Sequence, residues 1–242
     1  MKLKTFLIVG CLGGLFTLSS CTAPTNVKDY SAYVNPFIGT GGHGHTFPGA
    51  VVPHGMIQPS PDTRIDGWDA CSGYYYADST INGFSHTHVS GTGCCDYGDV
   101  LLMPTVGKQQ YRTTDPQSQR LAYASSFSHK NEIAEPGYYS VFLDTYQVKA
   151  EISSTKRGAI HRYTFPENAG FIIDLDYSLQ RQTNSEMEIE VISDTEICGH
   201  KKTTYWAFDQ YINFYAKFSK PFSYTLVTDS ITMDNGKRLP VC

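Results

Sequence analysis

Short segments in which apolar and polar residues alternate follow one another along the chain from Asp99 onward. They are rich in Val, Ile, Tyr, Phe and Thr, and a period of two residues is typical of half-buried strands. Turn-forming sequences separate them, such as Glu135-Pro136-Gly137, Lys156-Arg157-Gly158 and Glu167-Asn168-Ala169-Gly170. Because no long amphipathic helix lies between the segments, we expect an all-β fold, an antiparallel β-sandwich, rather than βαβ units. The predicted strands are Asp99–Met103, Tyr138–Tyr146, Val148–Thr155, Ala159–Phe165, Gly170–Tyr177, Glu188–Ile192, Tyr205–Lys217 and Ser223–Met233.

The last of these segments predicts a β-hairpin. Ser223–Met233 leads into Asp234-Asn235-Gly236, in which Asn and Gly tolerate the positive φ angles of a two-residue turn. Only Lys237–Cys242 follow, and Pro240 cannot donate to a ladder, so we expect no return strand. This predicts a C-terminally truncated piece of a longer protein, with an exposed last strand.

The segment Val34–Thr105 departs from the strand pattern. It reads VNPFIGTGGHGHTFPGAVVPHGMIQPSPDT and then GWDACSGYYYADSTINGFSHTHVSGTGCCDYGDVLLMPT, and is rich in Gly, His and aromatic residues. Glycine lets the backbone approach a ligand closely, and loops of this kind carry sites on a scaffold built elsewhere. We therefore expect the binding site here.

The N-terminus has the features of a targeting segment. Lys2 and Lys4 precede an apolar run of about thirteen residues, Phe6–Leu18, which is shorter than the ~20 that span a bilayer. Leu18-Ser19-Ser20-Cys21 resembles a bacterial lipobox, which implies cleavage before Cys21 and its lipidation. We expect residues 1–21 to be a lipoprotein signal peptide, 22–32 a tether and 33–242 the β-sandwich domain. A plain secretory signal is the alternative.

This N-terminal segment predicts an exported protein, lipid-anchored to the outer membrane or periplasm-facing membrane of a Gram-negative bacterium. The chain has 242 residues and a net charge of −4, and its basic residues are scattered, so we expect no binding of nucleic acid.

The cysteines after Cys21 are odd in number and lack C-x-x-C spacing, so we expect mostly buried thiols, with a bridge from Cys71 to Cys94 or Cys95 as the alternative. The other two are Cys198 and Cys242.

Two histidine pairs are candidates for a metal site. His43-Gly44-His45 and His86-Thr87-His88 each place two imidazoles at positions i and i+2, on one face of an extended strand. No carboxylate spacing singles out a further ligand, which favours pocket histidines that hydrogen-bond a ligand such as a sugar.

Trp68 lies in the loop Gly67–Tyr74, beside Asp69. An indole face stacks on the C–H face of a pyranose while a carboxylate accepts hydroxyl hydrogen bonds; the alternative is a Trp that caps the sheet core. Glycoside hydrolysis needs two carboxylates flanking the scissile bond. Asp62, Asp66, Asp69, Asp96 and Asp99 are available in this region, but their separations depend on the fold.

The quoted run from Tyr33 to Thr105 strongly resembles the N-terminal domain of glycoside hydrolase family 92, the calcium-dependent exo-acting α-mannosidases. The resemblance implies a β-sandwich packed on a C-terminal (α/α)6 barrel, with an inverting active site at their junction. The acid, the base and the calcium ligands of the family lie on the barrel, so no catalytic or metal-binding residue and no bound calcium is expected in this chain alone. His54 stands where the family implies Phe.

The resemblance also implies substrate-binding residues. Trp68 would bound the leaving-group sugar subsite, and the loop residues facing the junction would be Gly41, Gly42, His43, Arg64, Asp69, His86 and His88. We expect the substrate-pocket domain of an exported α-mannosidase acting on terminal α-linked, chiefly α-1,2-linked, mannose of glycans, inactive as an isolated chain. The alternatives are a stand-alone carbohydrate-binding module and a histidine-based metal-dependent hydrolase.

Overall fold

The computed structural model describes residues 28–111, 117–181, 183–227, 232–234 and 237–239, so Cys21, the expected signal peptide and much of the tether lie outside the described residues. The described residues from Ser31 onward belong to one compact unit, and residues 28–30 belong to a separate one. The described helices are single 3-10 turns, η1 (Ser31–Tyr33), η2 (Trp68–Ala70) and η3 (Leu179–Arg181). None of them is long or apolar enough to cross a bilayer.

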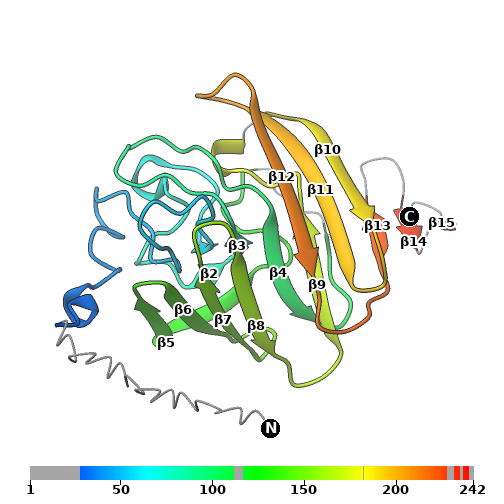
Figure 1. The fold of residues 1–242 in the computed structure, drawn as a ribbon, viewed down its shortest axis with the longest axis horizontal. Coiled ribbons are helices and arrows are strands. Elements are labelled where there is room, and N and C mark those ends of the chain that lie inside the picture. Colours follow the sequence, from blue (N-terminus) through cyan, green and yellow to red (C-terminus); the bar gives the residue numbers. More distant parts are fainter. Residues whose placement is uncertain (1–27, 112–116, 182, 228–231, 235–236, 240–242) are drawn as a thin grey trace, which may run out of the picture. The chain divides into compact units, whose positions relative to one another are not determined.

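The expected all-β class is confirmed, and every sheet is antiparallel (Figure 1). The strands are β1 (Ser60–Asp62), β2 (Thr80–Ile81), β3 (Gly83–Ser85), β4 (Leu101–Val106), β5 (Ser125–Glu135), β6 (Tyr138–Leu143), β7 (Val148–Ser154), β8 (Ala159–Thr164), β9 (Ala169–Asp174), β10 (Thr183–Val191), β11 (Glu196–Thr204), β12 (Gln210–Lys217), β13 (Thr225–Val227), β14 (Thr232–Asp234) and β15 (Lys237–Leu239).

Two of the sheets enclose the hydrophobic core. One has the order β1-β3-β4-β9 and the other β2-β5-β6-β7-β8. Phe84 on β3 and Tyr139 on β6 are fully buried, and their ring centroids lie 6.3 Å apart across the interface. Burying a side chain of this size contributes about 1.5–3 kcal/mol, so these facing strands stabilise the scaffold on which the loops before β4 rest.

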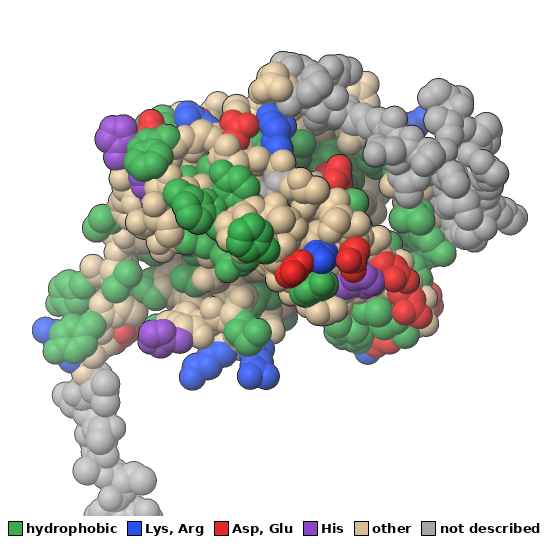
Figure 2. All heavy atoms as spheres, turned by 90° about the horizontal axis from the view of Figure 1, so that it is seen from above, with side chains coloured by type: hydrophobic (Ala, Val, Ile, Leu, Met, Phe, Trp, Pro, Cys, Tyr) green, Lys and Arg blue, Asp and Glu red, His purple; other side chains and the backbone are tan. Residues whose placement is uncertain are grey.

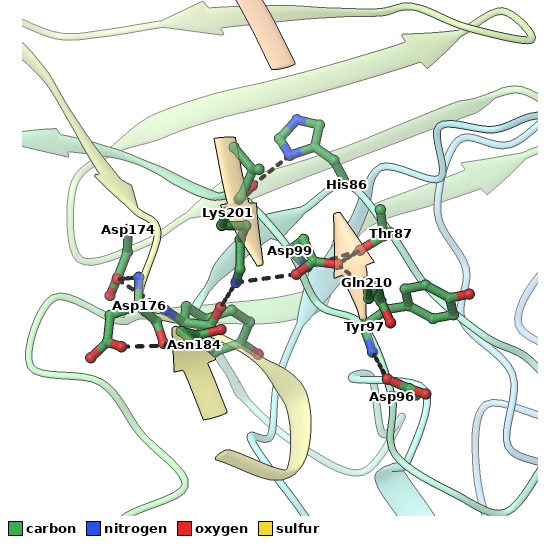
Figure 3. Close-up of polar contacts among 12 residues, drawn as sticks. His86, Thr87, Asp96, Tyr97, Asp99, Asp174, Asp176, Asn184, Lys201 and Gln210 are labelled. Carbon is green, nitrogen blue, oxygen red and sulfur yellow. Dashed lines mark hydrogen bonds and ion pairs between the residues drawn. The ribbon is translucent and has the colours of Figure 1, made fainter. Parts of the chain in front are cut away.

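The third sheet, β10-β11-β12, is joined to this scaffold by a buried ion pair (Figure 3). Lys201 Nζ on β11 lies 3.1 Å from Asp99 Oδ1 and donates to the Tyr177 carbonyl oxygen at 2.7 Å, and neither charged side chain is exposed. Asp99 Oδ2 accepts hydrogen bonds from Thr87 Oγ1 at 2.7 Å and Gln210 Nε2 at 3.2 Å. Burial lowers the pKa of Lys201, and the Asp99 carboxylate opposes that shift.

The C-terminal hairpin corrects the sequence-based expectation. The segment predicted as one strand forms β13 and β14, and β14 pairs with β15, with Asp234 opposite Lys237. The expectation that no return strand follows Gly236 was therefore wrong. A two-residue turn needs only a few residues after it, and Pro240 lies beyond the paired ones.

The strands β1, β2 and β3, each of two or three residues, were not predicted from the sequence, and neither were the two longer strands β5 and β11. Both carry charged residues at buried positions, Glu132 on β5 and Lys201 on β11, which break the alternation of apolar and polar residues. Tertiary partners satisfy these charges, and a pattern based on hydrophobicity does not register them.

Candidate sugar-binding site

The Gly-rich segment before β1 folds into a tight loop that brings His43 and His45 together. A side chain at Gly44 would collide with the Gly39 carbonyl oxygen, so glycine is required there. The carbonyl oxygen of His45 accepts hydrogen bonds from Ser72 Oγ and from the Gly91 amide, both at 2.6 Å. These bonds tie the loop to the segments on either side of the second histidine pair.

Helix η2 presents Trp68 to solvent and Asp69 to the histidine loop. The Trp68 residue is 61% exposed, and the His45 ring packs edge-on against its indole with centroids 4.8 Å apart. The His43 Nδ1 atom lies 2.5 Å from Asp69 Oδ1. The predicted residues His43, Trp68 and Asp69 are therefore neighbours, and Gly41 and Gly42 lie exposed in the same loop as His43.

An open depression of about 450 Å³ lies beside Trp68. Gly93 forms part of its wall, where a Cβ atom would lie 2.6 Å from Trp68 Cη2, so the indole requires glycine at this position. Figure 2, which views the end carrying the β11–β12 connection, shows hydrophobic side chains grouped among polar ones on this face. The lining residues come from four separate segments and are Asp66, Gly67, Trp68, Gly93, Cys94, Cys95, Gln180, Tyr205 and Trp206.

The part of this wall contributed by Gln180, Tyr205 and Trp206 was not predicted from the sequence. Trp206 is 66% exposed in the turn between β11 and β12, which the sequence analysis assigned to a strand. One signal was available, because Trp206 is the second of only two tryptophans in the chain.

The second histidine pair lies in the interior, apart from His43 and His45. His88 is buried, with Nδ1 2.7 Å from the Gln58 carbonyl oxygen and Nε2 2.8 Å from Asp62 Oδ1. His86 Nδ1 lies 2.6 Å from the Val100 carbonyl oxygen, and its Nε2 lies 3.2 Å from His161 Nε2. The alternative of one metal site built from both pairs is therefore not found among the described residues, because other groups of the protein contact the ring nitrogens of His86 and His88.

Burial sets the protonation of His86 and its neighbour His161, which together are called the interior pair below. It lowers the pKa of His86, and it lowers the pKa of His161 well below the usual value, with a further lowering from the neighbouring His86. Both imidazoles are thus neutral at pH 7. As placed, His86 and His88 lie beneath the loops rather than at the depression, and their predicted contact with substrate stays a prediction.

Arg64 also has a partner within the fold. Its guanidinium donates from Nε to Asp78 Oδ2 and from Nη2 to Asp78 Oδ1, each at 2.9 Å, and lies 4.3 Å from the centroid of the Tyr75 ring. Such a two-pronged ion pair fixes the guanidinium. Its predicted role in substrate binding likewise stays a prediction.

The cysteines among the described residues, Cys71, Cys94, Cys95 and Cys198, are free thiols, so the alternative of a bridge from Cys71 is not found. Burial raises the pKa of the Cys95 thiol to about 12 and raises that of Cys71 as well. Both remain protonated at neutral pH, and neither is suited to act as a nucleophile.

The chain matches the family model of the glycosyl hydrolase family 92 N-terminal domain over residues 33–239. It is 39% identical to a family GH92 alpha-mannosidase from Bacteroides thetaiotaomicron solved in complex with mannoimidazole, with a TM-score of 0.76, covering 86% of this chain and 27% of that one. It is 27% identical to a GH92 inverting mannosidase from the same organism, with a TM-score of 0.67, covering 88% and 28% of the two chains.

A curated relative, an uncharacterized secreted glycosidase from Arthroderma benhamiae, is 32% identical over 143 residues, which are 58% of this chain and 18% of that protein. The chain thus spans less than a third of the length of these relatives. Since the family model covers most of its length, this chain belongs to glycosyl hydrolase family 92, as the N-terminal domain of that family.

Proposed function

We propose that this chain forms the sugar-binding N-terminal part of an exported exo-acting α-mannosidase that releases terminal α-linked mannose, chiefly α-1,2-linked, from glycans. The observation that carries the proposal is the exposed indole of Trp68 at the rim of the depression. An aromatic face that is held in place yet open to solvent suits the apolar face of a pyranose. The His45 ring and Gly93 both lie against the indole of Trp68.

The acid and base of hydrolysis lie elsewhere in the enzyme in this proposal. Inverting hydrolysis uses two carboxyl groups about 6.5–9.5 Å apart, one as acid and one as base. Among the described residues that line the depression, Asp66 is the one carboxylate, and Gln119 Nε2 and Arg181 Nε bind its two oxygens. This chain therefore binds and orients the sugar, and it does not hydrolyse mannosides by itself.

Calcium, which the family resemblance implies, does not fit the donor set of this site. Ca²⁺ takes six to eight oxygen ligands, whereas the cluster of His43, His45 and Asp69 offers two imidazole nitrogens and one carboxylate. Calcium is accordingly proposed to bind on the remainder of the enzyme, together with the catalytic carboxyl groups.

Export is supported by the charged and apolar segments at the N-terminus and by the name of the secreted fungal relative. We propose lipidation of Cys21, so that the protein is held at a membrane surface by its lipid alone. Mannose-containing glycans are the proposed partners.

The experiment measures binding of α-1,2-mannobiose to the full chain by calorimetry, and mannose release in the same samples. We expect binding without release, and at least about tenfold weaker binding in Trp68→Ala, a loss of about 1.4 kcal/mol. Tyr211→Ala is the matched control, because Tyr211 is 58% exposed but lies outside the lining. α-1,3-Mannobiose tests the linkage preference and should bind more weakly.

Three outcomes bear on the proposal separately. Equal binding by Trp68→Ala and the unsubstituted chain would remove Trp68 from the site. Mannose release by the chain alone would contradict the assignment of the acid and base to the remainder of the enzyme. Restoration of hydrolysis by a separately produced C-terminal domain of a GH92 mannosidase would support it, and would argue against a stand-alone binding module.

A further inference from the structure

His43, His45 and Asp69 form a cluster of metal-ligand type at the base of Trp68. Each residue offers one ligand atom, and these atoms all lie within 4.8 Å of one another. The two histidines come from the loop before β1 and the carboxylate from η2. Two segments far apart in the sequence thus meet at one point, with two nitrogens and one oxygen facing each other.

A second observation concerns His45. This residue is only 8% exposed, and its buried Nε2 atom has no hydrogen-bond partner among the described residues. A buried polar atom without a partner is costly, so such atoms normally have a protein, water or ion partner. Neither the fold nor the proposed sugar contact with Trp68 provides one for this nitrogen.

We propose that His43, His45 and Asp69 bind a transition-metal ion of the zinc class. Imidazole and carboxylate ligands suit Zn²⁺, and catalytic-type zinc sites use three protein ligands with a solvent position left open. This set of two imidazoles and one carboxylate differs from the all-oxygen ligands that calcium takes, so the proposed site is separate from the calcium site expected elsewhere in the enzyme. Metal binding at this cluster uses only this chain's own residues and does not depend on the proposed sugar binding.

The geometry requires small side-chain shifts. Ligand atoms about 2.0–2.2 Å from Zn²⁺ in a tetrahedron lie roughly 3.4 Å from one another. The His43–Asp69 contact of 2.5 Å must therefore open, and the longer separations, up to 4.8 Å, must close. The His43 side chain is 78% exposed, so it has room to adjust.

A bound ion would connect the histidine loop to η2 and fix the position of Trp68. The His45 ring already contacts the indole edge-on, with centroids 4.8 Å apart. In a Trp206→Phe variant, Trp68 is the remaining tryptophan, so its fluorescence reports on the site alone.

The test is calorimetric titration of the full chain with Zn²⁺ alone, with melting temperature as a second readout. We expect one ion per chain, a higher melting temperature, and changed Trp68 emission in the Trp206→Phe background. His43→Ala and Asp69→Asn should each weaken binding at least about tenfold, since loss even of an outer-shell partner costs 10–100-fold. His200→Ala, which removes a partly exposed histidine on β11, is the matched control and should bind normally.

Cys94→Ser separates this site from a thiolate site, because Cys94 also lines the neighbouring depression. Zn²⁺ affinity that persists in Cys94→Ser and falls in His43→Ala supports the proposal. Absence of binding, equal binding by His43→Ala, loss of binding in Cys94→Ser, or competition by Ca²⁺ at equal concentration would each overturn it.

Discussion

At the scale of single residues, histidines of similar sequence pattern have different roles. His43 is exposed on a loop, His45 is buried beside Trp68, and His86 and His88 are bound within the interior. His161 on β8 completes the interior group, with Nδ1 2.7 Å from the Tyr163 hydroxyl and Nε2 facing His86. Spacing along the chain therefore does not distinguish a ligand-binding imidazole from a structural one.

The interior pair makes stability depend on pH. Because folding lowers the pKa of His86 and of His161, the unfolded chain takes up protons below its pKa of about 6.5 while the folded chain does not. These two groups therefore leave the free energy of unfolding unchanged above pH 7, and they lower it progressively as the pH falls below about 6.5. The slope is at most about 1.4 kcal/mol per pH unit for each imidazole.

Urea unfolding of the full chain at pH 7.5 and pH 5.5 measures this effect. His161→Gln should show a smaller loss of stability between the two pH values than the unsubstituted chain, while His200→Gln should show the same loss. An unchanged loss in His161→Gln would exclude the interior pair as its source. Asp174, whose pKa is raised by burial, shifts stability in the opposite direction and is present in all three chains.

At the scale of elements, the sheet β10-β11-β12 depends on one buried charge. Lys201 reaches from β11 to Asp99, just before β4, and the same carboxylate accepts from Gln210 at the start of β12. This sheet carries Tyr205 and Trp206 in the β11–β12 connection, so the ion pair also positions one wall of the depression.

Lys201→Ala should lower the free energy of unfolding by about 3–5 kcal/mol, because it leaves the Asp99 carboxylate buried without a counter-charge. Lys217→Ala is the control. Its ammonium lies 2.8 Å from Glu196 Oε1, but the lysine side chain is 65% exposed, and solvent-exposed pairs of this kind contribute little to stability. Adding Asp99→Asn to Lys201→Ala should recover part of the loss. Equal costs for the two lysines in chemical denaturation would contradict this assignment.

At the scale of the whole molecule, large hydrophobic side chains are exposed around the β11–β12 connection. Trp206 is 66% exposed, Phe208 83% and Tyr205 44%. Soluble monomeric proteins seldom expose large continuous apolar patches, and such patches mark surfaces that contact a partner. The solved relatives are several times longer than the matched region, so further polypeptide is available in them to cover this face.

We therefore expect the full chain to associate reversibly as its concentration rises. Sedimentation velocity should show a rising average mass, and Phe208→Ser should reduce it. Ile160→Ser, which changes an equally prominent apolar residue on β8 (71% exposed), should not. A monomer at all concentrations, or the same effect from both variants, would show that the β11–β12 face is not responsible.

Much of the scaffold was predictable from the sequence. The strands corresponding to β4, β6, β7, β8 and β9 follow alternation and turn residues, because these depend on local backbone geometry and on which face is buried. The strands β5 and β11 were not predictable, since Glu132 and Lys201 are buried only because distant groups pair with them. The short return strand β15 was missed because so few residues follow the turn.

By itself, the sequence determined the all-β class, the family and the importance of the loops around Trp68, because glycine positions, turn residues and apolar periodicity act over a few neighbouring residues. Only the tertiary structure decided that His43 and His45 meet Asp69, that His86 instead meets His161, and that Trp206 joins Trp68 at one depression. Contacts between residues so far apart in the chain depend on how the sheets pack, and no local pattern encodes that packing.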